Sequence, residues 1–304
     1  MADPNLAIHS TRLPQITPGS GVSVREDVAF SDAQGKERPR LRKTTHQTFS
    51  RLQEILPRVL QPREVVLYAL AAHAPISPLA QFFLGWQVYG FTRTILVVTN
   101  LRLLRFRIRS KGWNKYVWDQ GLQSAAFADL SEAQVKGFVA PQLVLDYRNG
   151  RKERYWHLLR RDAKKLKAVL PVLLQNITGG VTSTGGMVSL CPKCLAALTP
   201  STYRCAQCGQ LFKDEKTLQR FMLIPGGEFF YVGQNHIGAL HGLGQAFWLL
   251  AILAVAVSVM VGRRHVNASA TLLPAALIFL VFMVHKLAGF IPCRQLVREF
   301  IPLK

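Results

Sequence analysis

The chain has 304 residues, enough for two or three folded modules. Its 38 Lys and Arg residues outnumber 17 Asp and Glu residues, which gives a net charge of +21. Most of the excess lies in residues 47–178, where 20 basic side chains accompany 8 acidic ones. Such a module suits an anionic partner, either lipid or nucleic acid. The first residues show no basic region followed by an apolar core, so we expect no signal peptide and, before any membrane span, reduced thiols.

Residues 1–46 are predicted to be a disordered tail. Segments such as ITPGSG and SDAQGKERPR hold few aromatic residues and bury too little surface to offset the entropy lost on ordering. The basic cluster at 36–43 is interpreted as a solvated linker, and attraction to a membrane surface is the alternative.

Residues 47–178 are predicted to form a small antiparallel β-barrel or orthogonal sandwich that ends in a helix. Apolar residues at helical spacing start this region, although Pro57 must kink or end that helix. Short segments rich in β-branched and aromatic residues follow, separated by Gly, Pro and Asn. The first four are 64–73, 86–91, 93–99 and 102–109. Asn149-Gly150 predicts a tight hairpin, and Asp162 is expected to cap the closing helix.

The order of these segments carries a family resemblance. LQPREVVLYAL precedes a strand that runs into VVTNLRLLRF, and LVLDYRNGRKERYWHLLRRDAKKLKAVL comes later. This order resembles the bacterial pleckstrin-homology (PH) family of the YokE-like type, in which a strand ends in a Thr-Asn-x-Arg turn. Thr99, Asn100 and Arg102 match that turn. The resemblance covers 47–178 and implies a PH-like binding or scaffolding fold, whose last helix caps the open end of the barrel, without known chemistry. We cannot match the phosphoinositide pocket of eukaryotic relatives.

Alternating arginines mark one segment of this region. Period-two geometry places them on one face of a strand and Leu104, Phe106 and Ile108 on the other. A solvated outer face is one interpretation. The functional alternative is a stripe that binds anionic lipid, made by Arg105, Arg107, Arg109, Lys111 and Lys115.

Four cysteines give the most specific motif of the chain. A Gly, Ser and Thr-rich stretch, 179–188, is predicted to be a flexible linker. It is followed by two C-x-x-C pairs ten residues apart: Cys191, Cys194, Cys205 and Cys208. Four thiolates at this spacing can close a tetrahedral shell around zinc, with no position left for water or substrate. Residues 189–212 resemble the zinc-ribbon family, and we predict structural zinc rather than a redox pair.

The C-terminal region contains two long runs without a charged residue, 229–262 and 265–285. Within them, Ile237 to Val261 and Ser269 to Leu287 are each long enough to cross a bilayer. Because only a short turn joins these segments, we predict a transmembrane helical hairpin over 237–289. A hairpin buried in a soluble core is the alternative, but the first segment lacks the polar stripe of a surface helix.

The flanks of the hairpin bear on its topology and packing. Residues 213–236 are predicted to be a juxtamembrane segment with interfacial aromatic residues, and 290–304 a cytoplasmic tail. Basic residues on both flanks favour cytoplasmic N and C termini. Arg263 and Arg264 in the turn weaken this prediction, because basic residues there favour the opposite orientation. Gly238 and Gly242 have the spacing of a close helix contact, which we expect within the hairpin rather than between chains.

The remaining residues add little chemistry. Cys293 is expected to be a free thiol, with lipidation as the alternative. The histidines show no metal-ligand spacing on one helix, and the chain has no Walker loop, nucleophile elbow, G-x-G-x-x-G motif or HExxH helix.

Two hypotheses of function follow. The first is a membrane-anchored, non-enzymatic adaptor in the bacterial cytoplasmic membrane, with the PH-like domain binding anionic lipid or a protein and the zinc ribbon acting as a spacer. The alternative is a membrane-tethered nucleic-acid-binding protein that uses the ribbon and the basic barrel. The ribbon is nearly neutral and offers only Tyr203 and Phe212 for stacking, so nucleic acid is the less favoured partner.

Overall fold

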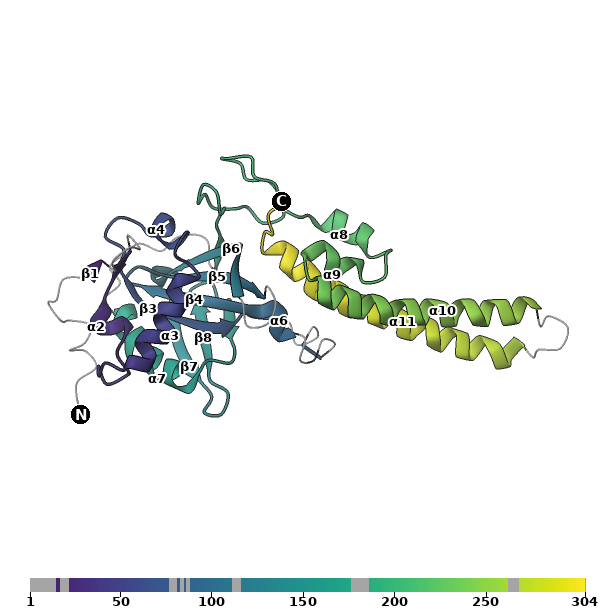
Figure 1. Ribbon diagram of the computed structural model, residues 1–304, viewed down its shortest axis with the longest axis horizontal. Helices are drawn as coiled ribbons and strands as arrows, with labels where there is room; N and C mark the ends of the chain where they lie inside the picture. Colours follow the sequence, from purple (N-terminus) through teal and green to yellow (C-terminus); the bar gives the residue numbers. More distant parts are fainter. Residues whose placement is uncertain are drawn as a thin grey trace. The chain divides into compact units, whose positions relative to one another are not determined.

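The computed structural model describes residues 15–16, 22–76, 81–82, 85, 88–110, 116–175, 186–261 and 268–303 (Figure 1). The chain divides into two compact units, each of which is described by itself. Unit 1 comprises Met1–Pro75, Tyr89–Thr199 and Cys205–Gly209. Unit 2 comprises Ile76–Val88, Pro200–Arg204 and Gln210–Lys304.

Unit 1 is built on two open antiparallel sheets. Its strands are β1 (Gln15–Ile16), β2 (Ser23–Val24), β3 (Val66–His73), β4 (Arg93–Thr99), β5 (Arg102–Ser110), β6 (Tyr116–Ala126), β7 (Leu130–Lys136), β8 (Gln142–Tyr147), β9 (Lys152–Tyr155) and β10 (Val188–Ser189). The first sheet has the order β1-β2-β3-β4-β5-β6-β10, in which only the β2–β3 pair is parallel, and the second has the order β7-β8-β9. Neither sheet closes on itself, so the predicted barrel is wrong and the two-sheet alternative fits.

Helices cover these sheets. They are α2 (Glu26–Ala29), α3 (Pro39–Ser50), α4 (Leu56–Val59), α6 (Val88–Thr92), the short 3-10 turn η2 (Phe127–Asp129) and α7 (Arg160–Gln175). The closing helix is confirmed, but it begins before the expected cap. Asp162 is instead buried and accepts a 2.8 Å hydrogen bond from the Tyr68 hydroxyl. The strand predicted at 86–91 is replaced, over its described residues, by α6.

Both faces of the first sheet are buried, which explains the continuous apolar run of β4. Leu96 and Val98 join a core with the second sheet and α7. Ile95 and Val97 point to the other face and join a core with the N-terminal segment and α4. A strand covered on both sides needs apolar residues at every position, whereas a half-exposed strand alternates.

The N-terminal segment is part of this fold. Residues 22–46 were expected to lie in a disordered tail, but Val22, Val24, Val28, Phe30 and Leu41 are all buried. β2 extends the first sheet beside β3, and α3 begins within the basic cluster. The prediction is wrong for these residues because a few apolar side chains, spaced among many charges, suffice to cover a sheet that is already formed. The rest of 1–21, apart from β1, lies outside the described residues.

The Thr-Asn-x-Arg turn between β4 and β5 closes around a buried carboxylate. The Arg102 guanidinium donates from Nε and Nη2 to the two Glu64 oxygens, each at 2.9 Å. The Thr99 hydroxyl donates to the same carboxylate at 2.8 Å. The Asn100 side-chain oxygen accepts from the Val65 backbone at 2.9 Å. The motif therefore joins the start of β3 to the β4–β5 turn.

The Asn149-Gly150 hairpin is confirmed between β8 and β9. Gly150 adopts a left-handed conformation with φ of 83°, and its N–H donates to the Tyr147 carbonyl at 2.9 Å. Glycine adopts this conformation without the steric cost that a side chain brings.

Unit 2 is helical. Its helices are α8 (Glu215–Phe221), α9 (Gly227–Val232), α10 (Asn235–Val261) and α11 (Ala268–Arg298). The predicted cytoplasmic tail is largely helical, since α11 continues to Arg298. At the end of α11, Arg294 and Arg298 each contact the Glu215 carboxylate at 2.7 Å. The last described residues then return, and Leu303 donates from its backbone to Leu211 at 3.0 Å.

Candidate metal centre and membrane-spanning hairpin

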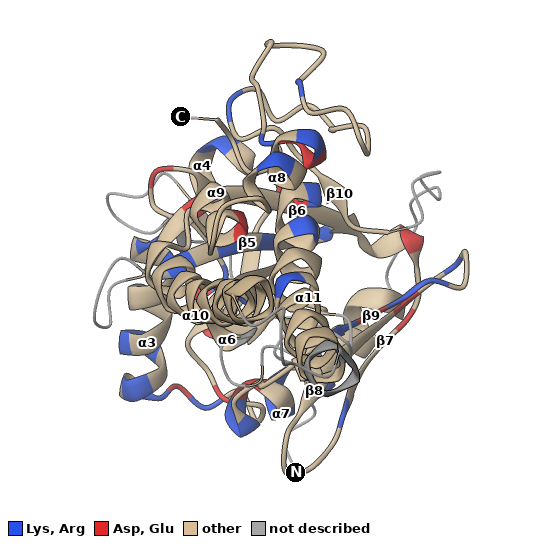
Figure 2. Cartoon of the chain, turned by 90° about the vertical axis from the view of Figure 1, so that its right-hand side faces the viewer, with Lys and Arg blue, Asp and Glu red and all other residues tan. Residues whose placement is uncertain are grey.

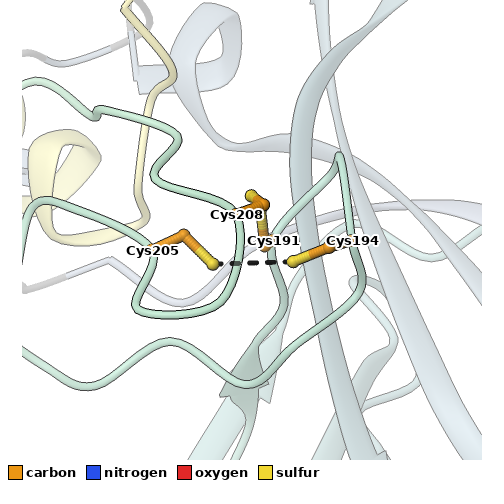
Figure 3. A group of neighbouring side chains, drawn as sticks. All are labelled: Cys191, Cys194, Cys205 and Cys208. Carbon is orange, nitrogen blue, oxygen red and sulfur yellow. Dashed lines mark hydrogen bonds between the residues drawn. The ribbon is translucent and has the colours of Figure 1, made fainter.

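The four predicted cysteines come together in unit 1. Their sulfur atoms all lie within 4.8 Å of one another, and the Cys191–Cys208 and Cys194–Cys205 sulfur pairs are both 3.5 Å apart (Figure 3). A disulfide would bring two sulfurs to about 2.05 Å, so the cysteines are free thiols here. Four sulfurs around zinc, each at about 2.3 Å, would lie roughly 3.8 Å apart. The group therefore has the size and donor set of a tetrahedral metal site.

The two C-x-x-C segments have the same backbone design. In each, the residue after the second cysteine has a positive φ, 63° at Leu195 and 73° at Gly209. The N–H of that residue donates to the carbonyl of the first cysteine, at 2.8 Å to Cys191 and 3.0 Å to Cys205. The turn folds both thiols of each pair toward one point. Glycine is suited to this position, whereas Leu195 adopts it against a steric cost.

The first pair is joined to the sheet. β10 pairs with β6 immediately before Cys191, and the Leu190 N–H donates to the Leu122 carbonyl at 2.9 Å. Leu190 and Leu195 pack against the core beneath α4, and Arg58 donates to the Lys193 carbonyl at 2.8 Å. The expected linker therefore does not extend through residue 188. Residues 176–185 lie outside the described residues.

The thiols differ in acidity. Burial raises the pKa of Cys191 to about 12. Burial acts in the same direction on Cys205, but the backbone N–H groups of Cys208 and Gln207 oppose it and bring the Cys205 pKa down to about 7. A thiolate is the form that binds a metal, and a bound cation lowers the pKa of its thiol ligands further.

The predicted hairpin is confirmed as two helices that are long and apolar enough to cross a membrane. α10 has 27 residues and α11 has 31, against about 20 needed for the hydrocarbon core. Only 6% of the most apolar stretch of α10, and 28% of that of α11, is buried within the chain. α10 contains no Asp, Glu, Lys or Arg, whereas α11 contains Lys286, Arg294 and Arg298 towards its C-terminal end. In Figure 2 both helices are seen nearly end-on, and blue residues are visible on α11.

The predicted glycine contact lies within the chain. A Cβ at Gly226 would overlap the Gly238 carbonyl oxygen and would come within 2.9 Å of the Gly242 nitrogen. Gly226 itself has φ of 68°. The two glycines of α10 therefore receive the Pro225-Gly226-Gly227 turn before α9, as expected for packing inside the hairpin region.

A polar network that the sequence did not reveal lies at this end of the hairpin. Glu228 is fully buried and accepts from the Gln245 side chain at 2.8 Å. Lys286 lies 3.3 Å from the same carboxylate and donates to the Ile224 carbonyl at 2.8 Å. In the sequence, Glu228 and Lys286 each look like an ordinary charged residue at the end of an apolar segment. An uncompensated charge here would be costly, which explains why both are present.

Two histidines meet across the same pair of helices. The rings of His241 and His285 approach to 3.0 Å between Nδ1 and Nε2. Gly244 makes room for His285, because a Cβ there would come within 2.8 Å of its ring. No spacing on a single helix could predict this pair. The antiparallel register of α10 and α11 brings the two rings together.

The arginine stripe is not the exposed face that was expected. Arg105 and Arg107 are buried, and Arg107 lies 3.1 Å from the Asp119 carboxylate. Its side chain lies over Gly121, where a Cβ would come within 2.9 Å of it. Arg105 donates to Gln123 at 2.7 Å, and Arg109 lies 3.8 Å from Asp119. Alternation along β5 was predicted correctly, but exposure was wrong because both faces of the strand are covered. Lys111 and Lys115 lie outside the described residues.

Cys293 is fully buried on α11. This fits a free thiol better than a lipidated one, because an acyl group needs an accessible sulfur.

The sequence was compared with models of known protein families and with curated proteins. It matches none of them.

Proposed function

We propose that the chain is an integral membrane protein that acts as a non-enzymatic adaptor. The α10–α11 hairpin anchors it in a cytoplasmic membrane with both termini in the cytoplasm. Unit 1 is a PH-like domain that binds anionic lipid or a protein at the membrane face. The four cysteines hold structural zinc.

The uncovered apolar surface of α10 carries this proposal. A core helix of a soluble protein of this length would be covered by its own chain, but almost none of the apolar stretch of α10 is. In water, exposed side chains such as Leu243, Leu250 and Leu253 would forgo the favourable free energy of burying their apolar surface. A bilayer is the environment that supplies this gain over such a length.

The order of elements in unit 1 supports the PH-like assignment. Four consecutive antiparallel strands, β3 to β6, form the centre of one sheet and three more, β7 to β9, form the other. α7 follows directly and packs on the core shared by both sheets. This is the order that the resemblance implied, and the binding role is proposed from that resemblance, because a fold by itself does not imply a function.

The donor set supports zinc with a structural role. Four thiolates fill a tetrahedral shell, so no position remains for water or substrate. A set of four sulfurs also suits iron. The two metals differ in colour, because only a thiolate-bound iron absorbs strongly in the visible range.

Membrane integration is tested by alkaline carbonate extraction of membranes that contain the full chain. The parent should remain in the membrane pellet and dissolve only in detergent. Leu250→Lys with Leu253→Lys, two charges in the middle of α10, should increase extraction. The matched control places lysines at Leu101 and Val117, exposed residues of unit 1, and should remain in the pellet. A parent chain released by carbonate alone would contradict the anchor.

The metal is tested on the purified full chain. One zinc per chain and no visible absorption are expected. Cys205→Ser should lose the metal, whereas Cys293→Ser, which changes the cysteine outside the site, should keep it. Iron in place of zinc would overturn the assignment of the metal, and retention of metal by Cys205→Ser would overturn the site.

The adaptor role is tested on the chain purified in a mild detergent. Mass spectrometry of the retained molecules should find anionic lipid enriched over zwitterionic lipid, or a protein in fixed proportion. Retention of neither would contradict a binding role for unit 1.

A further inference from the structure

The turn between β7 and β8 is apolar where a hairpin turn is usually polar. It reads Gly-Phe-Val-Ala-Pro over 137–141, without a charged or hydrogen-bonding side chain. Phe138 is 83% exposed and Val139 is 79% exposed, and nearby Leu159 is 52% exposed. Among the described residues of unit 1, no other large apolar side chain is as exposed as these first two.

The turn is held close to the start of α7. The Leu158 N–H donates to the Pro141 carbonyl at 3.1 Å. The Arg160 guanidinium carbon lies 5.3 Å from the centre of the Phe138 ring, a cation–π distance. Gly137, with φ of 82°, allows the tight approach of the Ala140 carbonyl. The apolar residues and the first turn of α7 thus form one surface, which we call the apolar tip.

Exposed basic residues lie on the two elements that carry the apolar tip, β7 and α7. Lys136 ends β7, while Arg160, Lys164 and Lys167 repeat at helical spacing along the exposed face of α7. Figure 2 shows basic residues, in blue, on α7. Within the described residues, Lys136, Arg160 and Lys164 form no ion pair. The acidic residue of α7, Asp162, is buried and bonded to Tyr68.

We infer that the apolar tip, with Lys136, Arg160 and Lys164, inserts into the headgroup region of a bilayer that contains anionic lipid. An aromatic ring and aliphatic side chains gain by leaving water, and the surrounding cations attract the negative surface. Nucleic acid would use the charges but would leave Val139 and Leu159 without a partner. The inference rests on the proposed function in one respect, namely that the α10–α11 hairpin keeps unit 1 beside a membrane.

The size of the effect follows from the charges. Each basic residue near an anionic leaflet changes the ratio of bound to free protein by about fivefold, and three change it by roughly a hundredfold. Replacing them by glutamate should therefore abolish the association rather than weaken it slightly. Raising the salt concentration should reduce it too, because the surface potential falls off within a Debye length.

The test uses the full chain in nanodiscs of phosphatidylcholine, with or without phosphatidylglycerol, and follows backbone hydrogen exchange. Phosphatidylglycerol should slow exchange across 137–142 by about tenfold or more, and high salt should reverse this. The triple variant Lys136→Glu, Arg160→Glu, Lys164→Glu should remove the slowing. Phe138→Ser with Val139→Ser, which changes no charge, should reduce it as well.

A matched variant controls for net charge. Lys36→Glu, Arg40→Glu and Lys43→Glu reverse three exposed basic residues elsewhere in unit 1 and should keep the slowing. A variant that fails to fold is recognised because the core amides of α7 and β8 lose their protection from hydrogen exchange. Equal exchange with and without phosphatidylglycerol, or equal loss in both triple variants, would overturn the inference. Slowing by a single-stranded oligonucleotide but not by phosphatidylglycerol would overturn it in favour of nucleic acid. A chain that never enters nanodiscs would instead contradict the membrane anchor.

Discussion

Replacing Arg102 by methionine is expected to destabilise unit 1 severely. The Glu64 side chain is fully buried and is bound by two guanidinium nitrogens at 2.9 Å, the Thr99 hydroxyl at 2.8 Å and the Gln61 N–H at 2.8 Å. Without Arg102, the carboxylate remains in the core with neutral donors only. Removal of one partner of a buried ion pair costs about 3–5 kcal/mol.

Three further variants show how much of this loss of stability comes from the ion pair. Arg102→Lys keeps the charge but loses the planar fork, so its loss of stability should be intermediate. Glu64→Gln combined with Arg102→Met removes both charges, and it should recover a large part of the stability lost by Arg102→Met alone. Glu64→Gln alone completes the cycle, and the energy of the pair is the stability lost in the double variant minus the sum of the losses in Arg102→Met and Glu64→Gln.

Hydrogen exchange of the β3, β4 and β5 amides in the full chain measures this energy locally. A loss of about 4 kcal/mol speeds the exchange of the slowest amides by roughly a thousandfold. Exchange of the α10 and α11 amides serves as the internal control. If Arg102→Met changes the β4 amides by less than about fivefold, the Glu64–Arg102 pair does not stabilise the turn as argued.

Three other predictions concern stability. Burial lowers the pKa of Lys165 from 10.5 to about 8, so over this range the unfolded chain binds more protons than the folded one and unit 1 should become more stable as pH rises. Denaturation between pH 8 and 10 should show this rise in the parent and not in Lys165→Met; a parallel rise in both would refute it. Leu195→Gly should ease the strained turn but lose core packing, so the metal should be retained with little change in stability, whereas a loss of metal would contradict the account of the turn. Gly226→Ala should disturb the packing of α9 on α10 and raise protease sensitivity near residue 226, while Gly242→Ala, whose Cβ would lie 3.2 Å from the Pro225 carbonyl, should have a smaller effect; equal sensitivity would count against the close contact.

Local signals were sufficient where the chemistry is local. The spacing of the four cysteines predicted the metal cluster, because each C-x-x-C turn brings its own two thiols together. The hairpin helices followed from length and composition alone. Asn149-Gly150 predicted its turn because few other residues accept the required backbone conformation.

Prediction failed where tertiary contacts decide. The pattern of β5 separates Arg105 and Arg107 from Phe106, but it does not say that both faces are covered. Arg105 and Arg107 are buried on the face opposite Phe106, where they contact Gln123 and Asp119 of β6, while residues 22–46 pack on the Phe106 face. Neither set of contacts can be read from the pattern of one strand. In the same way, His241 and His285 are 44 positions apart, and only the register between two helices places them together.

α10 and α11 are proposed to cross the membrane as a hairpin. The most direct measurement is reporter topology in intact cells, with fusions at Met1, at Lys304 and at Asn267, between α10 and α11 in the sequence. We expect both terminal reporters to be active only in the cytoplasm and the reporter at Asn267 to be active only on the other side of the membrane. Terminal reporters on opposite sides, or a reporter at Asn267 on the same side as the termini, would contradict it.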